Sequence, residues 1–217
     1  MTRAKQRIQQ SNGVVIMRFR ALAAVSALTA LTLVGIVPAA QAADPPAPAT
    51  GVVVKVEKLS PEQARTVDAA SAARTAFSPE TQGRVLCFQA HARTAGWTAV
   101  VCSNEAGFTG TEAKNDPIDA VRFIVGTVGA LNFNVQTHWA NDGTASEDYV
   151  PPGYMLEISN ANGNVLEAIR LRSTNETMKA AAHVQNVGWK GTGQWSYDQW
   201  IGSIGEGHWM EAFWVDI

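Results

Sequence analysis

The chain has 217 residues, with 17 Lys and Arg against 19 Asp and Glu, which gives a formal net charge of −2. This length suits one medium-sized domain with a leader. Five of the basic residues and no acid lie within residues 1–42, so residues 43–217 have a net charge of −7. They contain no stripe rich in Lys or Arg. This argues against nucleic acid and anionic membrane surfaces as partners, because both are bound mainly through clustered cations.

Residues 1–42 have the pattern of an export signal. Two arginines precede a charge-free apolar run over residues 21–37, and Ala40-Gln41-Ala42 is the small-x-small sequence that signal peptidase accepts. We expect cleavage after this sequence and a secreted protein, with either Met1 or Met17 as the true start. The alternative is an uncleaved membrane anchor, for which about 17 apolar residues is the short limit.

Residues 43–82 are predicted to lead into the main domain. The first of them are rich in Pro and Ala and indicate an extended tether, and residues 52–59 could form one strand. Ser60 as N-cap and Gln63 three residues later form a capping signature, so we predict a helix over residues 61–77. We expect this helix to precede the main domain and not to belong to its core.

Two cysteines, Cys87 and Cys102, lie fifteen residues apart. In an exported protein such a pair is predicted to form a disulfide, which for a loop of this size contributes about 3 kcal/mol. The chain has no C-x-x-C, and His91 is the only histidine near the pair. We therefore expect no metal site and no cofactor.

From residue 83 onward, short apolar runs alternate with turn signals every eight to twelve residues, which is typical of an all-β domain. The phrases "AHARTAGW" (residues 90–97) and "AHVQNVGW" (residues 182–189) share Ala-His and Gly-Trp at one spacing. In each case an acid follows the tryptophan after 22 residues. A weaker copy has 28 residues between Trp139 and Glu167.

These copies define three units of about 45 residues, at 84–125, 130–172 and 179–217. A unit this short cannot bury its own apolar face, whereas three units around a common axis can share one core. We therefore predict a three-fold pseudosymmetric all-β domain, either a β-trefoil or a β-prism, preceded by a short helix.

The repeated residues are predicted to be structural. We expect the glycines to allow positive φ or close backbone approach, the tryptophans to meet in a shared core, and the closing acids to hold strand ends. The histidines should hold neighbouring loops by hydrogen bonds, with Phe133 in the histidine's place in the middle unit; a catalytic or metal-binding role is the alternative. The residues concerned are His91, Gly96, Trp97, Asp119, Trp139, Glu167, His183, Gly188, Trp189 and Glu211.

The units resemble the clostridial hydrophobic repeat with conserved tryptophan (the ChW repeat). The third unit matches that pattern best, with "AHVQNVGW" followed by a closing "EAFWVDI". The first unit matches in His91, Gly96-Trp97 and Asp119-Ala120, while the middle unit keeps Glu167-Ala168 and has His138-Trp139 in place of Gly-Trp. The resemblance implies an exported protein with a role in adhesion or in binding surface polymers.

The usual catalytic patterns are absent from the sequence. It contains neither H-E-x-x-H nor G-x-S-x-G, and both thiols are predicted to be bonded. A secreted glycosidase would usually need a larger scaffold for its cleft. We therefore expect a non-catalytic, monomeric binding protein, and a secreted hydrolase is the less favoured alternative.

A candidate ligand site lies in the aromatic-rich stretch of the third unit. Aromatic faces stack on sugars, and nearby polar groups hydrogen-bond hydroxyls, so we expect carbohydrate or a cell-wall polymer as ligand. The alternative is an extracellular protein bound through the same aromatic anchors. The predicted site residues are Trp195, Tyr197, Asp198, Trp200 and His208, whereas Trp209 and Trp214 are predicted to lie in a core strand.

Overall fold

The computed structural model describes residues 50–77, 83–103, 107–129, 131–191 and 193–217. The chain divides into two compact units, Met1–Ala43 and Asp44–Ile217, and every described residue belongs to the second. The predicted leader and its cleavage site therefore lie outside the described residues. Within the described ranges, no helix is long and apolar enough to cross a membrane.

The described residues form one helix and three antiparallel sheets, which confirms the predicted all-β class. In chain order the elements are β1 (Val52–Lys58), α1 (Pro61–Phe77), β2 (Leu86–Ala92), β3 (Gly96–Trp97), β4 (Val101–Cys102), β5 (Thr109–Gly110), β6 (Ile118–Val125), β7 (Phe133–Trp139), β8 (Gly143–Val150), β9 (Tyr154–Asn160), β10 (Leu166–Ser173), β11 (Lys179–Val184), β12 (Gly188–Gly191), β13 (Asp198–Gly202) and β14 (Met210–Asp216).

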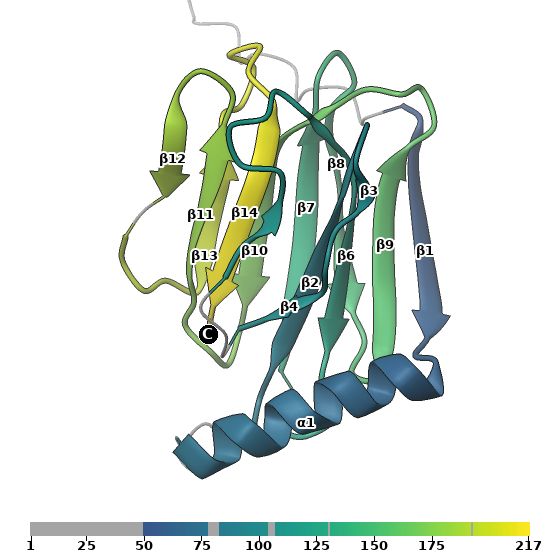
Figure 1. Ribbon diagram of the computed structural model, residues 1–217, viewed down its shortest axis with the longest axis vertical. Coiled ribbons are helices and arrows are strands. Elements are labelled where there is room, and N and C mark those ends of the chain that lie inside the picture. Colours follow the sequence, from purple (N-terminus) through teal and green to yellow (C-terminus); the bar gives the residue numbers. More distant parts are fainter. Residues whose placement is uncertain (1–49, 78–82, 104–106, 130, 192) are drawn as a thin grey trace, which may run out of the picture. The chain divides into compact units, whose positions relative to one another are not determined.

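The three sheets repeat one arrangement of strands (Figure 1). Sheet 1 has the order β1-β9-β6-β2-β3 with β4 also on β2, sheet 2 has β13-β10-β7-β8, and sheet 3 has β5-β14-β11-β12. Each sheet thus has a central pair from one sequence unit and a flanking strand from another: β9 joins sheet 1, β13 joins sheet 2 and β5 joins sheet 3. No sheet is complete without a strand from a second unit.

The strand register shows which residues of the three units correspond. His91, His138 and His183 each pair with the alanine that follows a closing acid, and each lies at a register shift. Five residues after each histidine comes a glycine at positive φ, with values of 78° for Gly96, 79° for Gly143 and 89° for Gly188. The prediction that Phe133 replaces the histidine is therefore wrong. The pattern shared by all three units is His-x4-Gly.

The core is built from phenylalanines and aliphatic side chains. Phe213 contacts both Phe88 and Phe123, with ring centroids 5.3 and 5.9 Å apart, and Phe133 packs on Phe123. Trp139 is fully buried, and its indole N–H donates to Thr137 over 2.8 Å. The predicted tryptophan centre is therefore wrong: one indole lies in the core, not three.

Register explains why Trp97 and Trp189 lie outside the core. Trp97 pairs with His91, and Trp189 pairs with His183. Cross-strand partners point to the same face of a sheet, and both histidines lie on the outer face because they alternate with buried neighbours. Trp97 is accordingly half-buried and Trp189 is 39% exposed.

Helix α1 begins with the predicted capping box. The Ser60 N–H donates to the Gln63 side chain over 2.9 Å, and the Gln63 N–H donates to the Ser60 hydroxyl over 3.3 Å. The helix lies across one end of the sheets (Figure 1). Its Val67 is buried in a second, smaller cluster with the disulfide Cys87–Cys102, whose formation confirms the prediction. The helix is thus outside the main core, as expected, but is packed against the domain.

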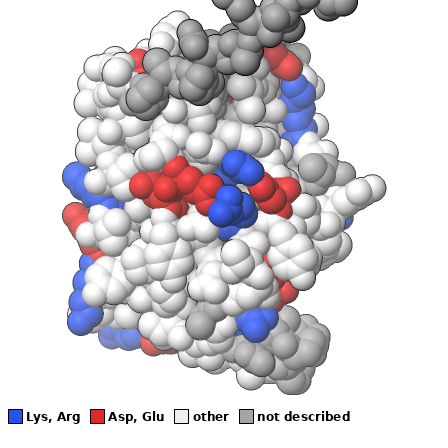
Figure 2. Space-filling model, turned by 180° about the vertical axis from the view of Figure 1, so that it is seen from behind, with Lys and Arg blue, Asp and Glu red and all other residues white. Residues whose placement is uncertain are grey.

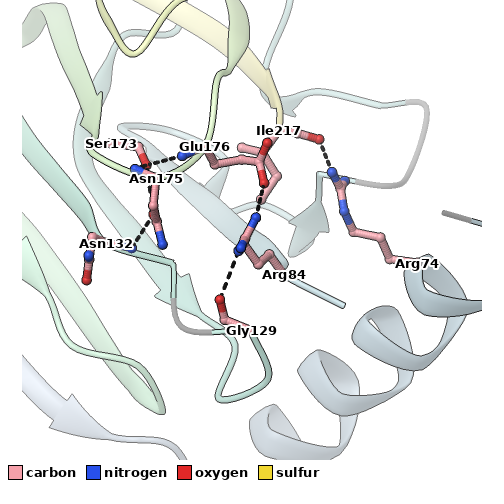
Figure 3. A network of polar contacts seen from close by, with 8 residues as sticks. All are labelled: Arg74, Arg84, Gly129, Asn132, Ser173, Asn175, Glu176 and Ile217. Carbon is pink, nitrogen blue, oxygen red and sulfur yellow. Dashed lines mark hydrogen bonds and ion pairs between the residues drawn. The ribbon is translucent and has the colours of Figure 1, made fainter. Parts of the chain in front are cut away.

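Strand β1 lies within the residues 52–59 that were predicted as a possible strand, and all seven of its residues pair with β9 at the edge of sheet 1. Near the helix, polar contacts join segments that are far apart in sequence (Figure 3). Arg74 of α1 donates to the Ile217 carbonyl oxygen, and Arg84 binds Glu176 over 2.7 Å and the Gly129 carbonyl over 2.9 Å. The Arg74 contact connects the helix to the end of the third unit, and the Arg84 contacts connect the start of the first unit to the segments that lie before and after the middle unit.

Candidate functional site

The outer face of each sheet carries one histidine beside the closing acid of the same unit. The distances are 2.6 Å from His91 Nδ1 to Asp119, 3.0 Å from His183 Nδ1 to Glu211, and 3.4 Å from His138 Nε2 to Glu167. In the part of the chain that the structure describes, no group of three or more His, Cys, Asp or Glu could hold a metal ion. Each pair connects neighbouring strands across the shift in register.

Four of the five predicted ligand-site residues come together around β13. Trp195 and Tyr197 precede the strand and expose 53% and 55% of their surface. Asp198 and Trp200 lie on the outer face of β13, beside β10. His208 does not join them, because it follows the opposite end of β13, which is about 13 Å long by the usual rise per residue.

Asp198 is held by a bidentate ion pair. Arg170 donates from Nε over 2.7 Å and from Nη2 over 2.6 Å to the two carboxylate oxygens. These hydrogen bonds hold the pKa of Asp198 below its ordinary value, so it is an acceptor at neutral pH. Its neighbour Trp200 pairs with Arg170 in the strand register, which places an indole beside this ion pair.

Polar side chains continue from this pair across sheet 2. Arg170 also approaches Gln136 of β7 over 3.5 Å, and Arg172 binds Glu147 of β8 over 3.1 Å. We call the set Asp198, Arg170, Gln136, Arg172 and Glu147 the Arg170 row. Figure 2, the view from behind, shows a band of acidic and basic side chains across the middle of the face, with further charged side chains toward its edges. The row offers both donors and acceptors along a sheet surface.

Sheet 1 has a similar polar cluster on an indole. The guanidinium carbon of Arg122 lies 3.6 Å from the ring centroid of Trp97. Arg122 also donates to Glu157 over 2.8 Å and to Gln89 over 3.3 Å. The face of the Trp97 indole is therefore covered by a cation of the chain itself, the guanidinium of Arg122.

Sheet 3 differs, because its outer face is aromatic. Trp189 meets Phe108 edge-on with ring centroids 5.6 Å apart, and its indole N–H donates to Glu112 over 2.7 Å. Trp214, predicted to be in the core, is half-buried on this face, and Trp209 is also only half-buried. Trp209 precedes β14, whereas Trp214 lies on this strand and points outward because it alternates with the buried Phe213 and Val215.

The residues that sequence reasoning missed are Arg122, Arg170, Phe108 and Glu112. A signal for the two arginines was present: each lies three residues after a closing acid, in "DAVR" and "EAIR", where the third unit has "EAFW". Phe108 and Glu112 carried no such signal, because they reach Trp189 only through the pairing of β5 with β14.

Two shallow pockets lie near the hairpin turns. One, of about 610 Å³, is lined by His183, Glu211 and Gly188 among others. The other, of about 490 Å³, is lined by residues of all three units, including Asp116 and Trp209. Burial acts to raise the pKa of Asp116, but hydrogen bonds from Thr94 and Ala95 outweigh it and leave this pKa lowered. The Asp116 carboxylate thus holds the turn at Thr94 and Ala95 by accepting their backbone N–H groups.

Comparison of the chain with protein-family models, with curated proteins and with solved structures finds no match. The resemblance to the ChW repeat therefore stays a prediction, carried by the residues of the three units.

Proposed function

We propose that the chain is a secreted, non-catalytic binding protein whose domain is a three-fold pseudosymmetric β-prism of ChW-like units. The proposal is supported by the shared strand order of the three sheets, by the cyclic exchange of β5, β9 and β13, and by the three His-x4-Gly hairpins. We prefer the prism to the trefoil because the strands form three separate sheets.

Export is supported by the leader pattern and by the disulfide. Cys87 and Cys102 are buried, and such bonds persist mainly in oxidising compartments. The net charge of −7 after removal of residues 1–42 suits a ligand other than nucleic acid.

The proposed ligand is carbohydrate or a cell-wall polymer, bound on the outer face of sheet 2. The observation that carries this is the exposure of Trp195 and Tyr197, both more than half exposed, beside the Arg170 row. Aromatic rings give stacking surfaces for the apolar faces of sugars, and the paired Arg170 and Asp198 present fixed donors and acceptors to hydroxyls. An extracellular protein held by the same aromatics is the second candidate.

The test is binding of purified residues 44–217 to a glycan array and to isolated cell-wall polymer, followed by titration calorimetry. Trp195→Ala and Tyr197→Ala should each weaken binding by about tenfold, since loss of one aromatic anchor costs roughly 1–2 kcal/mol. Tyr154→Ala is the matched control, because Tyr154 is an exposed aromatic on sheet 1. Unchanged affinity in both variants would exclude this site, and capture of a protein from culture supernatant without any glycan binding would favour the second candidate.

A further inference from the structure

The position three residues after the closing acid holds Arg122 in sheet 1, Arg170 in sheet 2 and Trp214 in sheet 3. The first two arginines make the same set of contacts. Each binds a carboxylate on the neighbouring exchanged strand, Glu157 or Asp198, and each approaches a glutamine two residues before the histidine. In sheet 3 that glutamine position is Ala181, so this sheet lacks both members of the polar cluster.

Sheet 1 shows what the arginine does when an indole is present. The Arg122 guanidinium stacks on the Trp97 ring at 3.6 Å, while His91 meets the same indole at an interplanar angle of 69°. A guanidinium over an indole face is attracted by the negative face of the ring. In sheet 1 the chain itself therefore supplies the cation that stacks on the Trp97 ring.

Sheet 3 keeps the indole, but in the part of the chain that the structure describes no cation stacks on it. Trp189 corresponds to Trp97 in register and is 39% exposed. His183 and Phe108 meet it at interplanar angles of 79° and 67°, so neither ring is stacked flat on the indole. The Glu112 carboxylate accepts the indole N–H over 2.7 Å and places a negative charge at the edge of the ring.

Among the described residues, no Lys or Arg side chain stacks on Trp189. Lys190, next in the chain to Trp189, is paired with Glu206 over 3.0 Å. Ala212 and Phe213, directly before Trp214, add no charge to the outer face. Ala212 is small and apolar, and Phe213 points into the core. Around Trp189 the outer face of sheet 3 is thus aromatic with a carboxylate at its side, while Lys179 lies at the other end of β11, opposite Asp216.

We propose that this face binds an organic cation, the guanidinium of an arginine side chain on a protein partner, against Trp189 with Phe108 and Glu112 beside it. The guanidinium is chosen because the chain places that group on the corresponding indole of sheet 1. This site is separate from the carbohydrate site proposed for sheet 2 and does not depend on it.

The test uses the peptide acetyl-Gly-Arg-Gly-amide and its citrulline counterpart, which has the same shape without the charge. Binding is followed by the indole N–H resonance of Trp189 in two-dimensional NMR of residues 44–217. The arginine peptide should shift this resonance in a saturable manner, and the citrulline peptide should bind about 2- to 5-fold more weakly. Equal shifts with both peptides, or no shift with either, would overturn the proposal, as would a preference for choline over the arginine peptide.

Three variants sharpen the test. Trp214→Arg would restore the cation found in sheets 1 and 2 and should abolish arginine binding by occupying Trp189 from within. Glu112→Gln should weaken binding about 2- to 5-fold by removing the charge at the ring edge. Trp195→Ala is the matched control: it should leave arginine binding unchanged and affect only glycan binding. If Trp214→Arg does not fold by circular dichroism, Glu112→Gln, a substitution at a half-buried position, decides alone, and unchanged binding in it would contradict the proposal.

Discussion

The seven tryptophans of the chain lie in very different environments. Trp139 is fully buried with its N–H bonded to Thr137, whereas Trp189 and Trp195 expose 39% and 53% of their surface. Side-chain chemistry is the same in each, so the difference comes from the face of the strand or loop on which each residue lies. Burial therefore separates tryptophans that stabilise the fold from those available to a ligand.

Trp139→Ala should lower the free energy of unfolding by about 3–5 kcal/mol, because it leaves a large cavity in the core. Trp189→Ala is the matched control and should cost about 1 kcal/mol, because that ring is partly solvated. Urea denaturation followed by circular dichroism measures both. Equal losses in the two variants would mean that the assignment of Trp139 to the core is wrong.

Asp116→Asn should lower stability by about 1 kcal/mol at neutral pH, because the carboxylate accepts the N–H groups of Thr94 and Ala95. The pKa of Asp116 is lowered in the folded state, so this contribution is present above the unfolded pKa of about 4 and is lost as pH falls through the folded value. Denaturation of both proteins across the range of about pH 2 to 7 tests this. A difference that does not shrink in acid would contradict it.

At the scale of the element, the hairpins and the exchanged strands depend on glycines for different reasons. Gly96, Gly143 and Gly188 end their turns at positive φ, and a side chain at Gly96 or Gly188 would meet open space. Gly110 and Gly202 lie on exchanged strands, where a Cβ would come within 2.2 and 2.3 Å of the carbonyl oxygens of Glu211 and Glu167. Close approach of two backbones therefore requires glycine at Gly110 and Gly202, but not at Gly96 or Gly188.

Gly202→Ala should lower the free energy of unfolding by more than about 2 kcal/mol, because φ is 103° and the added Cβ would force β13 away from β10. Gly207→Ala is the control: its φ is 72°, nothing lies within 4 Å, and it should cost only about 1 kcal/mol. Thermal unfolding compares the two. If the two variants have the same Tm, the close approach of β13 to β10 does not constrain stability.

At the scale of the whole molecule, the exchange of strands ties the three sheets to one another. Sheet 3 needs β5 from the first unit, sheet 1 needs β9 from the second, and sheet 2 needs β13 from the third. Removing any unit therefore leaves one sheet without its flanking strand and another without its central pair. Units that depend on neighbours in this way are expected to fold together.

Residues 44–217 should therefore unfold in a single cooperative transition, with circular dichroism and tryptophan fluorescence changing together. The isolated first unit, residues 84–125, should show no sheet signal, because its apolar face has no partner. Separate transitions for the two signals, or a folded isolated unit, would show that the units are independent.

The sequence alone was sufficient for features that depend on neighbours along the chain. The helix over residues 61–77 follows from the cap at Ser60 and Gln63, and the all-β class follows from turn residues and short apolar runs. The disulfide follows from the spacing of two cysteines in a chain that begins with the pattern of an export signal. Each of these signals lies within about fifteen residues.

Only the tertiary structure decided which face each side chain occupies and which distant residues meet. The sequence pattern aligns the middle unit with the other two on Trp139. Strand pairing instead aligns His138 with the other two histidines and places Trp139 in the core. A shift of one residue in register moves every side chain to the opposite face of a sheet. Because that register is set by strands of different units, and by bulges between them, no local pattern could show that Arg170 meets Asp198 or that Phe108 and Glu112 meet Trp189.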